Sequence, residues 1–181
     1  REMMYSFCQE HNLPHDKCGK IVVATSEQEI PALNMLEERG RANGLAGIKR
    51  LSSSEIKEYE PHASGIDGLF VPQTGIVDYV AVTNKYADLI RNNGGEIKLN
   101  SKQTSVKRDG KDFILLTEHT EYRTKFVVNC GGLQSDRVAK LCGVDPGLMI
   151  IPFRGEYYQL RKDKQYLVNN LIYPVPDPQF P

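Results

Sequence analysis

The sequence predicts a mixed α/β fold, α+β in part, in which a partial Rossmann-like domain with a β-meander interleaves with part of a β-sheet domain. Three observations support this class. Helix and strand patterns alternate up to Gly95, the apolar period changes to two over 97–128, and "FVVNCGGLQSDRVAKLCG" joins a strand to a helix through two glycines. This order is typical of nucleotide-binding α/β domains with an inserted meander.

The first half of the chain alternates between the two periodicities. In chain order the patterns predict a helix over 2–12, a strand over 19–25, a helix over 26–44, a short helix over 51–61, a strand and turn over 68–79, and a helix over 78–95. Ser26 and Glu29 have the spacing of a capping box at the start of the second helix. Glycines and Pro61 supply the helix ends.

Antiparallel strands follow the last of these helices. Ile97 and Leu99 alternate with polar residues, and 104–129 reads as three strands with turns at Asp109-Gly110 and Thr120-Glu121. The final apolar run, 126–128, is β-branched and aromatic, as in a strand covered on both faces. The pattern therefore predicts a meander that leads into a buried strand.

The turn after this strand is the first candidate site. Gly131 and Gly132 leave bare backbone, Ser135 is a candidate helix cap, Asp136 lies in the first turn, and Gly143 ends the helix. A helix N-terminus behind bare backbone suits an anion such as a dinucleotide phosphate. A tight turn with positive φ explains the same glycines, and the spacing is not G-x-G-x-x-G.

Composition excludes several classes of protein. The 181 residues carry a formal net charge of zero without a basic run, which argues against nucleic acid as a partner. No apolar stretch approaches the roughly 20 residues of a membrane helix. The spacing of the four cysteines favours a reducing compartment. Both ends fall inside apparent secondary structure, so we expect an excised fragment of a longer protein.

A zinc site is the alternative reading of the N-terminal region. Cys8, His11, His15 and Cys18 form C-x2-H-x3-H-x2-C, enough ligands for tetrahedral zinc. Pro14 interrupts the pattern, and the two halves read as a helix end and a strand start. We therefore expect the four side chains not to converge, and we assign no metal site.

A second cluster lies near the C-terminal end. "PFRGEYYQL" (152–160) reads as a strand on which Arg154, followed by Gly155, offers a guanidinium to a carboxylate or phosphate. Tyr157 and Tyr158 would then point to opposite faces of that strand. An ordinary sheet strand with a surface arginine explains the same residues.

Five stretches together resemble a known family, the L-2-hydroxyglutarate oxidase or dehydrogenase branch of the FAD-dependent D-amino-acid oxidase superfamily. They are "CGKIVVAT", "PQTGIVDY", "VVNCGGLQSDRVAKLCG", "IPFRGEYYQL" and "LIYPVPDPQFP". The "VVN-x-GG" strand and "RGEYY" are shared more loosely across the superfamily. The combination of GGLQSD, PFRGEYY and IYPVPDP is specific to the branch.

The resemblance implies domain and site assignments. Residues 76–148 would belong to the FAD-binding domain, and 1–75 and 149–181 to the substrate domain. FAD would meet Asn129, Cys130, Gly131, Gly132 and Gly155, and the substrate would meet Arg154, Tyr157 and Tyr173. Gln103 departs from the apolar residue often found near the adenine. The N-terminal G-x-G-x-x-G turn would precede Arg1, so we expect the fragment alone to be colourless and inactive.

The implied reaction is oxidation of L-2-hydroxyglutarate to 2-oxoglutarate by hydride transfer to flavin N5. Oxygen or a quinone would accept the electrons, and the general base stays unassigned. The resemblance implies a cytoplasmic protein and allows peripheral association with the inner face of a membrane. Unpaired sheet edges favour self-association of the fragment. Two alternatives stay open: a superfamily enzyme for glycerol phosphate or an amine, and a cofactor-free binding module.

Overall fold

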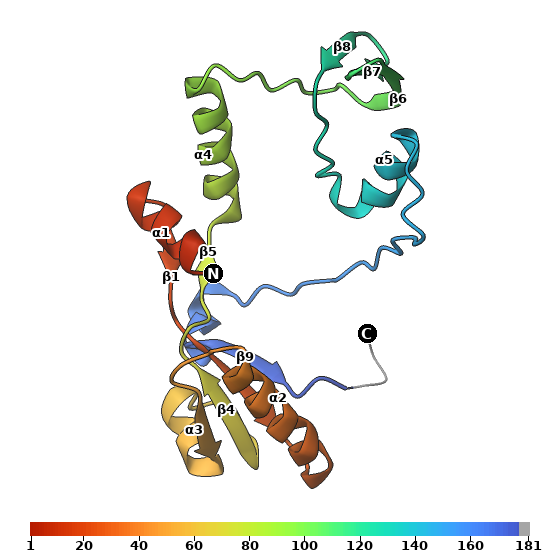
Figure 1. Ribbon diagram of the computed structural model, residues 1–181. Helices are drawn as coiled ribbons and strands as arrows, with labels where there is room; N and C mark the ends of the chain where they lie inside the picture. Colours follow the sequence, from red (N-terminus) through yellow and green to blue (C-terminus); the bar gives the residue numbers. More distant parts are fainter. Residues whose placement is uncertain (178–181) are drawn as a thin grey trace. The chain divides into compact units, whose positions relative to one another are not determined.

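The computed structural model describes residues 1–177 and divides into two compact units. The first unit combines Arg1–Leu89 with the chain from Gln159 onward, and the second is Ile90–Tyr158. Helix α4 (Tyr79–Asn92) runs across the division (Figure 1). Residues 178–181, the end of the "LIYPVPDPQFP" stretch, lie outside the described residues. The assignment of 1–75, 76–148 and 149–181 to domains of a larger protein stays a prediction.

The first unit is built on a four-stranded mixed sheet. Its strand order is β3 (Lys49–Ser52), β4 (Asp67–Val71), β2 (Lys20–Ala24) and β9 (Leu171–Pro174). β4 pairs antiparallel with both β3 and β2, whereas β9 pairs parallel with β2. β2 therefore lies beside a strand about 150 residues later in the chain, as its apolar composition allows.

Both faces of this sheet are covered, because the side chains of β2 alternate between two cores. Val22 and Ala24 pack with Leu33 of α2 (Ile30–Ala42), which follows a 3-10 turn η1 (Glu27–Glu29). Ile21 and Val23 pack with Ile56 of α3 (Ser53–Tyr59). The two helices therefore cover opposite faces of the sheet.

The capping box forms at a different serine from the one predicted. The Ser26 side chain caps nothing, and Glu29 instead accepts a hydrogen bond from the Thr25 backbone N–H at 2.7 Å. Ser52 and Glu55 form the reciprocal box at the start of α3. Hydrogen bonds from the Ser52 N–H, the Lys49 ammonium and the Ser52 hydroxyl, in that order of effect, lower the pKa of Glu55 to about 2. Ser26 fails as a cap because the chain enters a 3-10 turn there.

The first unit also contains an N-terminal helix, a two-stranded ladder and the start of α4. α1 (Glu2–Glu10) buries Cys8, and β1 (His15–Asp16) pairs with β5 (Ile76–Val77). Asp78 caps α4 by accepting hydrogen bonds from the N–H groups of Val80 and Ala81. The helices predicted over 2–12 and 78–95 are thus confirmed.

The second unit contains the predicted meander. β6 (Gln103–Asp109), β7 (Asp112–Thr117) and β8 (Glu121–Thr124) form an antiparallel sheet in sequence order. Gly110 turns the first hairpin with φ of +61°. Residues 97–99 are not part of a strand, although Ile97 and Leu99 alternate. Helix α5 (Ser135–Leu141) follows a 3-10 turn η2 (Gly132–Gln134), and Gly143 follows its end with φ of +76°.

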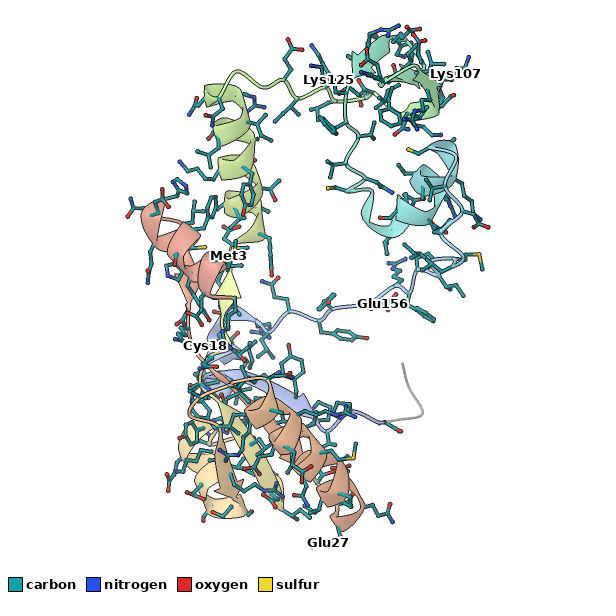
Figure 2. All side chains as sticks on the ribbon, viewed as in Figure 1. Met3, Cys18, Glu27, Lys107, Lys125 and Glu156 are labelled. Atoms are coloured by element: carbon teal, nitrogen blue, oxygen red, sulfur yellow. The ribbon has the colours of Figure 1, made fainter. Side chains whose placement is uncertain are left out.

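Two predicted strands are absent from the described residues. Phe126 and Val128 are 82% exposed, and 126–131 has no regular structure. Residues 149–161 are also irregular, including the stretch around Glu156 (Figure 2). A strand exists only where a neighbour accepts its backbone hydrogen bonds, and neither segment pairs with a strand within 1–177. The prediction of a buried strand at 126–128 is therefore wrong for this chain, as is that of a strand at 152–160.

Two short elements complete the described chain. The 3-10 helix η3 (Lys162–Leu167) precedes β9, whose position agrees with the strand-like "NNLIYPV". Within residues 1–177, none of the helices has the length and apolar character needed to cross a bilayer.

Candidate functional site

The glycine turn of the second unit is held by side chain to backbone hydrogen bonds. Asn129 accepts from the Gly131 N–H at 3.0 Å through Oδ1 and donates from Nδ2 to the Ser135 carbonyl at 2.8 Å. The Ser135 hydroxyl donates to the Gly132 carbonyl at 2.6 Å. Ser135 is thus the first residue of α5 rather than its cap, which corrects the predicted capping role. Asn129 instead organises the turn.

The two glycines are required for different reasons. A Cβ on Gly131 would lie 3.1 Å from Asn129 Oδ1 and 3.2 Å from Val138 Cγ2, so the packing of the turn leaves little room for it. Gly132 has φ of +53°, and a Cβ there would meet nothing within 4 Å. Gly131 therefore serves the turn itself, whereas Gly132 presents bare backbone to open space.

A buried carboxylate, Asp136, fixes the segment that follows α5. It is 6% exposed and accepts hydrogen bonds from the N–H groups of Ile150 at 3.2 Å and Arg137 at 2.8 Å. The Ile150 N–H lowers the pKa of Asp136, with a smaller contribution in the same direction from the Arg137 N–H. The sequence showed Asp136 only as an acidic residue in a first turn and did not reveal its distant partner.

This arrangement predicts a pH dependence. Because its folded-state pKa is lowered, Asp136 stabilises the second unit fully above the unfolded pKa of about 3.9, and this stabilisation is lost as pH falls through the folded pKa. We expect the Ile150 amide resonance to titrate with a midpoint below 3.9 in NMR spectra. Asp136→Asn should remove that titration. A midpoint at or above 3.9 would contradict the assignment.

Three of the predicted site residues, Arg154, Gly155 and Tyr157, lie in the irregular stretch 149–158 of the second unit. Arg154 has a side chain 88% exposed, and its Nη2 lies 3.9 Å from Glu156 Oε1. Tyr157 and Tyr158 are 96% and 99% exposed, and a Cβ on Gly155 would make ordinary contact with the Tyr157 ring at 3.6 Å. Without a strand, the two tyrosines do not define two faces. Cys130 is also exposed.

Tyr173, by contrast, lies on a paired strand of the first unit. It faces Val22 across the parallel β2–β9 ladder and is 49% exposed. The Nζ atom of Lys20 lies 5.4 Å from the centroid of the Tyr173 ring, within the range of a cation–π contact. The structure therefore joins Tyr173 to a lysine that the sequence analysis did not single out.

A cavity of about 630 Å³ lies in the first unit, on the sheet side that carries Lys20. Its walls come from α1, β1, β2, α2, β4 and the segments 43–48 and 73–79. Among the described residues, the lining includes the cations Arg1, Lys20 and Arg39 and contains neither aspartate nor glutamate. Apolar side chains form the rest of the wall, among them Val22, Leu36, Ile48 and Leu69. Such a lining suits an anion with a short hydrocarbon part.

The candidate zinc ligands lie around α1 and the strand that follows it. Cys8 is buried in α1, and the Nδ1 atom of His15 lies 2.8 Å from the Leu13 carbonyl oxygen. All four cysteines of the chain are free, outside any disulfide. In the described part of the chain, no three histidine, cysteine, aspartate or glutamate side chains are grouped closely enough to hold a metal.

Comparison with known proteins identifies the family. The model of the FAD-dependent oxidoreductase family matches residues 1–181. The chain belongs to this family. The mixed α/β class predicted from the sequence agrees with the structure and with the solved relatives described below.

Curated relatives of this FAD-dependent oxidoreductase bear a common name. The chain is 46% identical over 176 residues to L-2-hydroxyglutarate dehydrogenase of Indibacter alkaliphilus, covering 97% of the chain and 44% of the relative. It is 39% identical over 177 residues to the Escherichia coli K12 enzyme of that name, covering 97% and 42%. The human mitochondrial enzyme is 37% identical over 191 residues, covering 99% and 41%. The chain thus spans less than half the length of these relatives.

Solved structures confirm the fold. L-α-glycerophosphate oxidase of Mycoplasma pneumoniae, with FAD bound, matches with a TM-score of 0.73 at 22% identity, over 91% of this chain and 44% of that one. L-proline dehydrogenase of P. horikoshii matches with a TM-score of 0.77 at 14% identity, over 96% and 47%. At these identities the likeness concerns the fold alone.

Proposed function

We propose that this chain is part of an FAD-dependent dehydrogenase that oxidises L-2-hydroxyglutarate to 2-oxoglutarate. The observation that carries this proposal is the alignment of nearly the whole chain with bacterial and animal L-2-hydroxyglutarate dehydrogenases at 37–46% identity. The solved relatives named for glycerophosphate and proline are far less similar, at 22% and 14% identity. Sequence similarity therefore favours the hydroxy acid over the phosphate ester and the amine.

The glycine turn is the part of this chain that fits FAD. Gly132 has positive φ and open space where a side chain would project, and Asn129 and Ser135 hold the turn in that shape. We assign cofactor contact to Asn129, Cys130, Gly131 and Gly132, and to Gly155 beyond the helix. When bound, FAD supplies the acceptor for the hydride removed from the substrate.

Substrate contact is assigned to Arg154, Tyr157 and Tyr173. A guanidinium binds a carboxylate through two parallel hydrogen bonds, and a phenol can donate to a carboxylate or a hydroxyl oxygen. In this chain Arg154 and Tyr157 are almost fully exposed, so both side chains are accessible to a ligand. The general base stays unassigned.

Replacement of Arg154 by lysine tests the bidentate contact. In the intact flavoprotein, Arg154→Lys keeps the charge but loses the planar fork, so we expect kcat/KM for L-2-hydroxyglutarate to fall about 10- to 150-fold. The flavin content should stay that of the wild type. Unchanged kinetics would remove Arg154 from the substrate site.

Three further features come from the family resemblance and belong to this proposal. Oxygen or a quinone accepts the electrons from reduced flavin, the protein is cytoplasmic, and it associates peripherally with the inner face of a membrane. Self-association of the fragment is a separate expectation. It has physical support in the apolar side chains that the second unit exposes, such as Phe126 and Val128.

Anaerobic mixing of the intact flavoprotein with candidate substrates tests the reaction. We expect L-2-hydroxyglutarate to bleach the oxidised-flavin absorbance and to yield 2-oxoglutarate, and the D enantiomer to leave the spectrum unchanged. Bleaching by glycerol 3-phosphate or a secondary amine alone would identify the alternative enzyme class. Absence of flavin from the intact protein would favour the cofactor-free binding module.

A further inference from the structure

We infer that Lys20 binds one carboxylate of the dicarboxylate substrate in the cavity of the first unit and thereby selects dicarboxylates over monocarboxylates. This inference rests on the proposed function, whose site it extends to a residue outside the predicted set. The observation behind it is a juxtaposition. Lys20 lines a cavity to which no aspartate or glutamate of residues 1–177 contributes, and its ammonium lies beside Tyr173, which we assign to the substrate.

The charge of the cavity lining favours an anion. Three of its side chains are cations, and no aspartate or glutamate of the described chain lines it. Cationic groups around an apolar, partly enclosed space repel one another. An anion that binds among them reduces this repulsion, so the free energy of the site falls. A five-carbon dicarboxylate offers two charges for such groups and a short hydrocarbon chain for the apolar walls.

Position and partners single out Lys20 among the three cations. Arg1 is already engaged, because its Nε donates to Glu2 and its Nη1 to the Gln73 side chain, each at 2.8 Å. Arg39 is exposed in the last turn of α2, where solvent screens its charge and the helix C-terminus stabilises it.

Lys20 instead starts β2, a strand with a hydrogen-bonded neighbour on each side. It is half-buried, and its ammonium lies 5.4 Å from the centroid of the Tyr173 ring, in the range of a cation–π contact. A cation fixed on a rigid, doubly paired strand binds a ligand with little loss of entropy. The structure thus favours Lys20 as the carboxylate-binding group.

Ligands without the reactive hydroxyl separate binding from turnover. We would measure the dissociation constants of glutarate and pentanoate from the change in flavin spectrum of the intact protein, for the wild type and for Lys20→Met. Lys17→Met is the matched control, since Lys17 also lies over a tyrosine ring, Tyr5 at 5.5 Å, but is exposed and does not line the cavity.

We expect Lys20→Met to affect the dicarboxylate and not the monocarboxylate. The wild type should prefer glutarate, and Lys20→Met should weaken glutarate binding about 10- to 150-fold without changing that of pentanoate. Lys20→Arg, which keeps the charge, should retain most of the preference for glutarate, and Lys17→Met should behave as the wild type. Circular dichroism and flavin content report whether each variant folds.

Two outcomes would overturn the inference: no preference for glutarate in the wild type, or the same preference in Lys20→Met as in the wild type. Oxidation of L-2-hydroxyglutarate by the wild type is followed in the same preparation. If that oxidation fails while Lys20→Met still loses glutarate selectively, the proposed function is wrong and the carboxylate site stands. If oxidation occurs and Lys20→Met keeps the wild-type preference for glutarate, the proposed function stands and the carboxylate site at Lys20 is wrong.

Discussion

Gly132→Val in the intact flavoprotein should abolish FAD binding rather than slow turnover. Gly132 has φ of +53°, and a side chain there would project into open space that we assign to the cofactor. Valine is branched at Cβ, so it both fills that space and strains the backbone by about 1–3 kcal/mol. The measurement is the ratio of flavin to protein after purification, with circular dichroism as the test of folding.

Two further variants show whether the bulk of the new side chain or the backbone strain at positive φ causes the loss of FAD. Gly110 has φ of +61° and an equally open surrounding, but it turns the β6–β7 hairpin, so Gly110→Val should keep a full complement of FAD. Gly132→Asn places a side chain that tolerates positive φ at the same position. We expect it to lose FAD as well, because the obstruction stays. Stoichiometric flavin in Gly132→Val would show that this turn does not approach the cofactor.

The sequence predicts elements well where a local pattern and a local cause coincide. The apolar run of β2 is visible in "KIVVA", and the structure has two cores because both faces of that strand are apolar. The turns of the meander follow from Asp109-Gly110 and the apolar run at 112–117. In each case residues next to one another in the chain decide the outcome.

The same patterns mislead where the outcome depends on a partner. Residues 126–128 have the composition of a buried strand, yet Phe126 and Val128 are exposed because no strand of the described chain pairs with this segment. Both Ser26 and Ser52 precede a glutamate by three residues, but only Ser52 caps a helix, because a 3-10 turn follows Ser26. An apolar, β-branched composition is therefore not sufficient for a buried strand, and serine–glutamate spacing is not sufficient for a capping box.

The candidate functional site shows the same limit of prediction from sequence, because part of it depends on residues that are distant in the chain. Bare backbone at Gly131 and Gly132 is evident from the sequence, since glycine has no side chain. The contact of Lys20 with Tyr173 joins residues more than 150 positions apart, so no spacing rule reveals it. Asp136 and Ile150 are also brought together only by the path of the chain after α5.

A buried carboxylate that links α3 to β9 gives the largest effect on stability that we expect. Glu60 is fully buried, and its two oxygens accept hydrogen bonds from the Asn169 N–H at 3.1 and 3.0 Å. The Asn170 N–H donates to the same carboxylate. Both asparagine side chains also donate to the Tyr59 carbonyl, at 3.3 and 3.4 Å. Glu60 thereby fixes the chain just before Leu171, where β9 begins.

Glu60→Ala should destabilise the first unit by about 2–5 kcal/mol, because it removes the acceptor of the Asn169 and Asn170 N–H groups and opens a cavity where the fully buried Glu60 side chain lay. Thermal unfolding of the intact protein and hydrogen exchange at the Asn169 and Asn170 amides would measure the effect. Glu60→Gln keeps one acceptor oxygen, so it should lose less. Glu58 lies two residues away and is exposed, so Glu58→Ala should change stability by no more than about 0.5 kcal/mol.

The exchange data also decide whether the effect is local. If Glu60 acts by holding the start of β9, amides from Asn169 to Tyr173 should exchange faster in Glu60→Ala, whereas those of β3 should change only through global unfolding. Tyr173 would then lose its fixed place beside Lys20, and Glu60→Ala should weaken glutarate binding as well as stability. Equal stability of Glu60→Ala and Glu58→Ala would show that these backbone groups find other acceptors, and Glu60 would then have no part in positioning Tyr173.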